Sequence, residues 1–260
     1  DRSVSRGLGD VYKRQLPALL EKEAGGKILG HDLYLYIRQK ASVWGVDEEY
    51  ISSAALDDLE CAWGCTQGFL KGGDSASIPV LCVFDSEEVG SVSPQGAGSS
   101  LLEDTLGRIC DGLKLNRGRM LAQSFLVSAD NAHAVHPNHP EYADPGNAPV
   151  MGGGLVIKYN ANLSYCTDSV SAAVFRKICG RAGVKVQTYH NRADLPGGST
   201  LGRISLAHVS VPTVDIGLAQ LAMHSCYETA AVSDAIDLET AMAAYYGSTL
   251  EATESGFSIL

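Results

Sequence analysis

The stretch "LVIKYNANLSYCTDSVSAAVFRKICGRAGVKVQTYH", residues 155–190, decides the fold class. Its two ends, residues 155–160 and 184–190, are short and rich in β-branched residues, which is typical of buried strands. Between them, Val174, Phe175, Ile178 and Ala182 form one apolar stripe at helical spacing, and Gly183 comes next as a stop signal. The stretch therefore predicts a strand, a helix and a second strand in succession.

The same alternation extends along the chain. Residues 78–84, 124–130 and 212–217 read as further buried strands, and residues 57–72, 100–113 and 234–250 read as helices. Strands that alternate with helices predict an α/β fold, with a mainly parallel sheet flanked by helices. In such sheets, sites form from polar residues at the carboxyl ends of the strands.

Composition excludes two classes of function. Of the 260 residues, 45% are hydrophobic and 19% charged, as in globular proteins. No apolar run approaches the roughly 18 residues of a membrane span. The net charge of -10 argues against a nucleic-acid partner, because phosphate binding needs a basic surface. Seven scattered cysteines indicate reduced, buried thiols in a cytoplasmic protein, and the C-x3-C pair Cys61 and Cys65 suggests a zinc site only weakly.

The first fifteen residues, "DRSVSRGLGDVYKRQ", differ in character from the rest of the chain. They have no helical or strand periodicity, and they lack the apolar core of a signal peptide. They resemble translated adapter sequence from a sequencing library, and a disordered basic tail is the alternative. If the adapter interpretation is correct, the chain is truncated at its N-terminus.

Polar residues gather at or near the ends of the predicted strands. Carboxylates and an imidazole are the ligands that a hydrolytic dinuclear metal site needs. The candidates are Asp57, Glu87, Glu88, Asp130 and His224. Each also has a simpler interpretation. Asp57 can be a helix cap and Asp130 a turn cap. Glu87 and Glu88 can belong to a solvated loop, and His224 can be a core histidine.

Several longer segments, taken together, carry a resemblance. They are "KILGHDLYLYIRQKA", "EEYISSAALDDLE", "FDSEEVGSVSPQGAGS", "SADNAHAVHPNHPEYADPGNAP", "VIKYNANLSY", "NRADLPGGSTLGRI" and "TVDIGLAQLAMHSCYE". In this order they resemble the aspartyl aminopeptidases, a family of dinuclear zinc metallopeptidases. The resemblance covers residues 27–246 and implies a zinc-peptidase-like catalytic domain.

The resemblance implies a role for each candidate residue. Asp57 matches the carboxylate that bridges two divalent metal ions, taken to be zinc. Glu88 and His224 match the other ligands of one ion, and Asp130 matches a ligand of the second. Glu87 matches the general base that takes a proton from the attacking water.

Further positions match the substrate site of the family. His136 is expected to act in catalysis, by stabilising the tetrahedral intermediate, and His133 to contact the substrate. Both can alternatively be surface histidines of a loop. Lys158 and Tyr165 match residues that line the substrate pocket, where a lysine suits an acidic substrate side chain.

The implied function is removal of N-terminal Asp or Glu from peptides in the cytoplasm by a homo-oligomer, with no role for nucleic acid or membrane. The implied organisation is a non-native segment at residues 1–15, the end of a dimerisation domain at 16–50, and a catalytic domain lacking its N-terminal part at 51–260.

Two departures from the family pattern affect the expected activity. Asp58 stands where the family has asparagine, and the histidine that is the family's first metal ligand has no match here. We therefore expect one zinc ion to bind tightly and a second weakly, with impaired activity. A non-catalytic fragment that binds peptide or one metal, or a dinuclear aminopeptidase of different specificity, remains the alternative.

Overall fold

The computed structural model describes residues 15–195 and 197–260, so the adapter-like segment lies outside the described residues except for Gln15. The chain divides into two compact units, residues 1–36 and 37–260. In the first unit, a helix over residues 15–24 is followed by a stretch without helix or strand. The second unit holds every other described element. The expected division at residues 16–50 and 51–260 stays a prediction.

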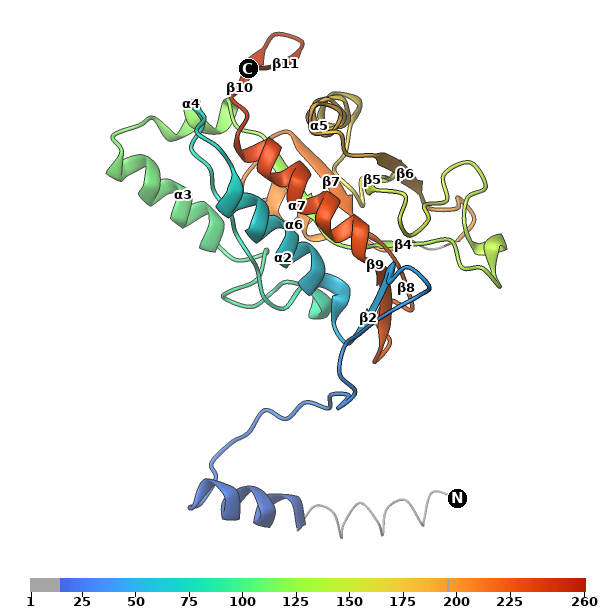
Figure 1. Ribbon diagram of the computed structural model, residues 1–260. Coiled ribbons are helices and arrows are strands. Elements are labelled where there is room, and N and C mark those ends of the chain that lie inside the picture. Colours follow the sequence, from blue (N-terminus) through green and yellow to red (C-terminus); the bar gives the residue numbers. More distant parts are fainter. Residues whose placement is uncertain (1–14, 196) are drawn as a thin grey trace. The chain divides into compact units, whose positions relative to one another are not determined.

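A four-stranded sheet lies at the centre of the second unit (Figure 1). Its order is β3 (Leu126–Ala129), β7 (Thr213–Gly217), β5 (Leu155–Tyr159) and β6 (Val186–His190). The pairs β3–β7 and β5–β6 are parallel, and β5–β7 is antiparallel. These four strands confirm the predicted strands 124–130, 155–160, 184–190 and 212–217.

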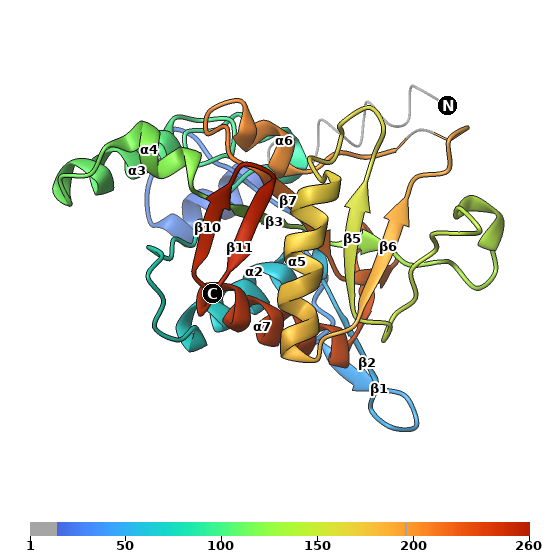
Figure 2. The same cartoon turned by 90° about the horizontal axis from the view of Figure 1, so that it is seen from above.

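Three helices cover one face of this sheet: α2 (Leu56–Lys71), α5 (Ser169–Ala182) and α7 (Val232–Tyr246). Ile157 and Ile216 from the sheet pack against Phe175 and Leu238 from the helices, and all four side chains are fully buried. Burying a side chain of this size stabilises the fold by about 1.5–3 kcal/mol. Figure 2 shows α5 lying along the sheet beside β5.

Sequence signals set the limits of α5. Asp168 accepts a hydrogen bond from Ser171 N, and the Ser171 hydroxyl accepts one from Asp168 N, so the two form a capping box. At the other end Gly183 adopts φ 74°, the left-handed conformation that glycine reaches at low cost. The predicted helical stripe and its glycine stop are confirmed.

A second, five-stranded sheet has the order β1 (Ser42–Trp44), β2 (Tyr50–Ser53), β9 (Glu228–Ala231), β8 (Ala219–Leu221) and β4 (Ala132–His133). Only the β4–β8 pair is parallel among these pairings. The chain passes from β3 to β4 through Asp130 and Asn131, and from β7 to β8 through Leu218. Asp130 therefore lies where the chain leaves one sheet for the other.

The remaining elements lie outside the two sheets. They are the 3-10 turns η1 (Glu87–Val89) and η2 (Pro140–Tyr142), the helices α3 (Leu101–Gly112), α4 (Arg117–Ala122) and α6 (Leu201–Leu206), and the hairpin of β10 (Leu250–Thr253) and β11 (Gly256–Ile259). None of the described helices is both long and apolar enough to cross a bilayer.

The α/β fold with parallel strands and flanking helices is confirmed. Both sheets are mixed, because the first contains the antiparallel pair β5–β7 and the second is antiparallel except for β4–β8. The predicted strand at residues 78–84 is wrong. A strand needs a partner backbone, and the described residues pair none with it. Its side chains are also partly open to solvent, with Val83 59% exposed.

All seven cysteines lie in the described residues and none forms a disulfide, as predicted. Cys61, Cys65, Cys110 and Cys179 are buried, whereas Cys226 is exposed. Cys61 donates a hydrogen bond to Asn131 Oδ1 at 2.9 Å, so this buried thiol has a hydrogen-bond partner in the core.

Candidate metal centre

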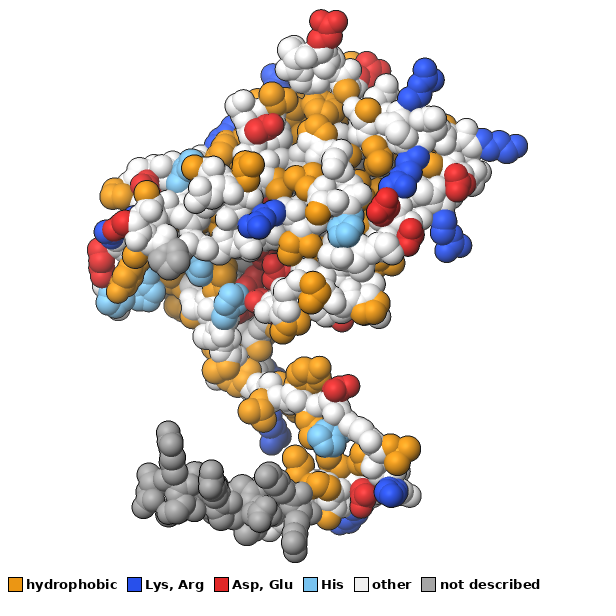
Figure 3. All heavy atoms as spheres, turned by 180° about the vertical axis from the view of Figure 1, so that it is seen from behind, with side chains coloured by type: hydrophobic (Ala, Val, Ile, Leu, Met, Phe, Trp, Pro, Cys, Tyr) orange, Lys and Arg blue, Asp and Glu red, His pale blue; other side chains and the backbone are white. Residues whose placement is uncertain are grey.

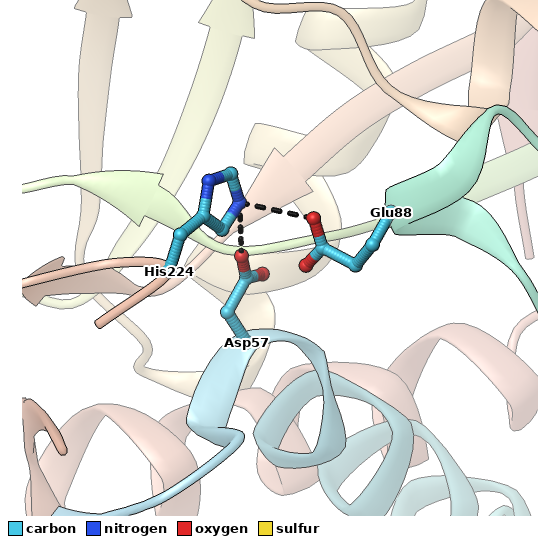
Figure 4. A group of neighbouring side chains, drawn as sticks. All are labelled: Asp57, Glu88 and His224. Atoms are coloured by element: carbon cyan, nitrogen blue, oxygen red, sulfur yellow. Dashed lines mark ion pairs between the residues drawn. The ribbon is translucent and has the colours of Figure 1, made fainter. Parts of the chain in front are cut away.

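Three side chains from distant parts of the second unit converge on one point (Figure 4). His224 Nε2 lies 3.1 Å from Asp57 Oδ2 and 3.1 Å from Glu88 Oε2. Asp57 comes from the start of α2, Glu88 from η1, and His224 from the loop between β8 and β9. The Asp57 side chain is 4% exposed, against 52% for Glu88 and 63% for His224. The group is anchored in the interior and opens to solvent on one side.

The backbone around Asp57 departs from a regular helix. Asp57 has φ −83° and ψ 109°, the next residue Asp58 is also non-helical, and the peptide bond between them is cis. Ala55 occupies the cap position and no side chain caps the helix, so the interpretation of Asp57 as a helix cap is wrong. Asp57 Oδ1 is buried without a hydrogen-bond partner. A carboxylate oxygen left in this way is suited to a cation.

A second group shares Asp57. Oxygen atoms of Asp57, Asp58 and Asp130 all lie within 4.8 Å of one another. Burial, followed by the charges of Asp130 and Glu88, raises the pKa of Asp57 to about 8. Burial and then the charge of Asp130 also raise the pKa of Asp58 well above its usual value. Carboxylates this close repel one another, and a divalent cation between them would offset that repulsion.

Asp58 is a possible contributor that the sequence marks only as a departure from the family pattern. Its Oδ1 is buried without a hydrogen-bond partner, like Oδ1 of Asp57. The only signal in the sequence was its position next to Asp57.

Asp130 is held by Lys158, which lies on β5 and is 1% exposed. Lys158 Nζ donates to the carbonyl oxygens of Asp130 at 2.7 Å and Asn131 at 2.9 Å, and lies 3.3 Å from Asp130 Oδ2. Burial is the largest single influence and lowers the pKa of Lys158, but Asp130, together with Tyr165, Asp215 and Cys61, outweighs it and leaves that pKa raised. The same ammonium lies 5.3 Å from the ring centre of Tyr165, which is 5% exposed. The structure thus brings Lys158 and Tyr165 together beside Asp130.

The end of β7 comes very close to Asp130. A side chain at Gly217 would overlap the Asp130 carbonyl oxygen, so only glycine fits this position. Strands β3 and β7 are paired as far as Ala129 and Ile216, and Asp130 N then donates to the Ile216 carbonyl oxygen at 3.1 Å, next to this glycine.

Glu87 lies beside Glu88 in the η1 turn and is half-buried. Burial, followed by the charges of Asp130 and Glu88, raises the pKa of Glu87. A carboxylate with a raised pKa is a better proton acceptor than an ordinary one. The pKa of Glu87 is therefore affected by Glu88 of the first group and by Asp130 of the second.

The two predicted substrate histidines are both exposed but differ in their neighbours. The neighbouring protein and then the charges of Lys158 and His224 lower the pKa of His133. His136 is exposed, its ring packs 5.4 Å from that of His139, and its Nδ1 accepts a hydrogen bond from Asn138 N. These contacts keep His136 within its own loop.

The simpler interpretation of His224 as a core histidine is wrong, because most of its side chain is exposed. In the space-filling view, acidic side chains gather beside a histidine on one face of the molecule (Figure 3). An imidazole with two carboxylates is a donor set that zinc accepts, and three carboxylates suit a divalent cation of harder character.

Comparison with known proteins identifies the family. Residues 10–246 match the family described as "Aminopeptidase I zinc metalloprotease (M18)". A "Probable M18 family aminopeptidase 2" of Clostridium novyi is 44% identical over 211 residues, which is 80% of this chain and 49% of that protein. The chain spans about half the length of the curated relatives it matches.

Two solved structures share the fold. The crystal structure of yeast aminopeptidase 1 is 26% identical with a TM-score of 0.77, covering 89% of this chain and 54% of its own. The mApe1 dodecamer of S. cerevisiae is 25% identical with a TM-score of 0.75, again covering 89% of this chain and 54% of its own. The chain belongs to the M18 family of zinc metalloproteases, whose members include aminopeptidase I.

Proposed function

We propose that this chain carries the catalytic site of a zinc aminopeptidase that removes the N-terminal residue of a peptide. The observation that carries the proposal is the convergence of His224 and Glu88 on Asp57, which a second carboxylate group shares. Asp57, Glu88 and His224 would hold one zinc ion. Asp130 and the shared Asp57 would hold a second ion, with Asp58 close enough to take part.

When bound, zinc supplies a Lewis acid that polarises a peptide carbonyl and lowers the pKa of water. Glu87 accepts the proton of the attacking water and passes it to the amine that leaves as the carbon–nitrogen bond breaks. The raised pKa of Glu87 suits both halves of this transfer. His133 and His136 are proposed to contact the substrate, and His136 to stabilise the tetrahedral intermediate. For His136 this requires its loop to move.

The substitution Glu87→Gln tests the proposal. It keeps the size of the side chain and removes its ability to accept a proton. In the enzyme that contains this chain, zinc content should stay within about 20% of the parent, while turnover falls at least about a hundredfold, the usual weight of a general base. A variant that retains both zinc and full turnover would remove Glu87 from the mechanism.

We propose N-terminal Asp or Glu as the preferred substrate residue. Lys158 uses two of its three donors on carbonyl oxygens, and its third contact, to Asp130 Oδ2, is the longest at 3.3 Å. If zinc binds the Asp130 carboxylate, this third donor is free to pair with an acidic substrate side chain, with Tyr165 beside it.

Lys158→Met tests this specificity, because methionine keeps the length of the side chain without its charge. The apparent KM for aspartyl and glutamyl substrates should rise at least about tenfold more than the KM for alanyl or leucyl substrates. Equal losses for all four substrates would mean that Lys158 only supports the Asp130–Asn131 segment.

The working protein is proposed to be a cytoplasmic homo-oligomer that acts on peptides. The dodecameric assembly of mApe1 supports the oligomer, since 89% of this chain aligns with that subunit.

A further inference from the structure

Glu228 is a buried carboxylate that belongs to neither metal-capable group, yet it contacts the backbones of two of their members. It is 2% exposed and begins β9. Its Oε2 accepts a hydrogen bond from Asp57 N at 2.9 Å, and its Oε1 accepts one from His224 N at 2.7 Å. The Glu228 side chain therefore links the backbones of Asp57 and His224, the two residues of the first group that are farthest apart in the sequence.

The sheet explains why one residue can reach both. Strand β9 lies between β2 and β8, with Glu228 opposite Ser53 on β2. Strand β2 leads directly to the start of α2, where Asp57 lies, and the loop from β8 to β9 carries His224. Both segments thus leave the sheet beside Glu228.

Both bonded amides would lack a partner without this carboxylate. An amide in the first turn of a helix has no acceptor within the helix, which is the situation of Asp57 N. His224 has φ 65°, so its backbone is in the left-handed conformation that few non-glycine residues adopt. The bond from its amide to Glu228 holds the loop in that conformation.

We propose that Glu228 is a positioning residue for zinc, which sets the separation between the Asp57 and His224 side chains through their backbones. The inference rests on the proposed function. Groups that orient metal ligands commonly change metal affinity by about 10–100-fold when they are altered.

The chain offers a matched control in Asp234. This side chain is 1% exposed, and its two oxygens accept hydrogen bonds from Gly152 N at 2.8 Å and Gly154 N at 3.0 Å. Asp234 therefore makes the same kind of two-amide clamp, but on a turn rather than on metal-ligand candidates.

The test compares Glu228→Gln, Glu228→Asp and Asp234→Asn with the parent chain. Glutamine replaces one acceptor oxygen by a donor that would face an N–H group, and aspartate keeps the charge but is too short to reach both amides. Zinc affinity is measured by competition with a chromophoric chelator, and Tm is measured in EDTA. Both Glu228 variants should bind the tight zinc about 10–100-fold more weakly, and Asp234→Asn should stay within about threefold, although all three lower the Tm.

Other outcomes would overturn the inference. Parent-like zinc affinity in both Glu228 variants, with only a lowered Tm, would make Glu228 merely structural. Parent-like affinity in Glu228→Asp alone would mean that its charge, not its bridge, acts on zinc.

A parent chain that binds no zinc would instead overturn the proposed metal centre. The bridge itself is then judged by amide hydrogen exchange without metal. Peptides that contain Asp57 and His224 should exchange faster in Glu228→Gln than in Asp234→Asn, and equal exchange in the two variants would overturn the inference on its own.

Discussion

The group of Asp57, Glu88 and His224 and the group of Asp57, Asp58 and Asp130 share one carboxylate but differ in donors and in exposure. The first combines an imidazole with two carboxylates, and two of its side chains are more than half exposed. The second contains only carboxylates and lies deeper, with an Asp130 side chain 15% exposed. Zinc in proteins favours sites with nitrogen or sulfur donors, whereas oxygen-only sites favour harder ions. The first group is therefore expected to be the tighter zinc site.

The second group carries a further cost at neutral pH. Asp57 is common to both groups, but Asp58 belongs only to the second, and because its pKa is raised well above the usual value, a cation that binds there must displace a further proton. Its affinity should therefore rise with pH more steeply than a single exposed carboxylate would cause. The two groups are therefore expected to differ in zinc affinity, both because their donor atoms differ and because the second group is more buried.

The largest expected effect comes from removing the residue that the groups share. Asp57→Ala should abolish tight zinc binding and weaken any remaining binding at least about a hundredfold, because each group loses a ligand. Zinc per chain after dialysis measures this. The control is Asp111→Ala, which removes an exposed carboxylate on α3 and should leave zinc content unchanged. Retention of a tight ion in Asp57→Ala would show that the groups do not share this carboxylate.

A smaller effect separates the two groups. Asp58→Asn keeps the size of the side chain but removes its charge, so the second ion should bind about tenfold more weakly while the first changes less than about threefold. Stepwise zinc titration resolves the two affinities. Equal weakening of both ions would mean that Asp58 acts on the whole centre rather than on its second group.

The sequence predicted the parts of the fold whose signals are local. The apolar stripe of α5 ends at Gly183 in both the pattern and the structure, and β5 alternates Leu155 and Ile157 against Val156 across the sheet. Strands β8 and β9 were not predicted, because they are only three and four residues long and contain the polar residues Gln220 and Glu228. The strand predicted at residues 78–84 is wrong for the opposite reason: its residues are typical of a strand, but no partner strand pairs with them among the described residues.

The candidate centre could be predicted only through resemblance. Asp57, Glu88 and His224 are far apart in the chain, and no spacing rule joins them. The resemblance brought forward all three, and it also brought forward His136, whose described contacts stay within its loop. The resemblance did not indicate Asp58 or Glu228 as possible parts of the metal centre. Their proximity to the centre depends on the backbone conformation at the start of α2 and of β9.

Zinc titration of the parent chain and of His224→Ala is the sharpest test of the proposed metal centre. Metal-free chain is titrated with zinc against a competing chelator, and the bound ions are counted after dialysis. We expect the parent to bind one ion tightly and a second at least about tenfold more weakly, and His224→Ala to lose the tight ion. Two ions of equal affinity in the parent, or a tight ion that survives in His224→Ala, would show that His224, Asp57 and Glu88 do not form the tight site.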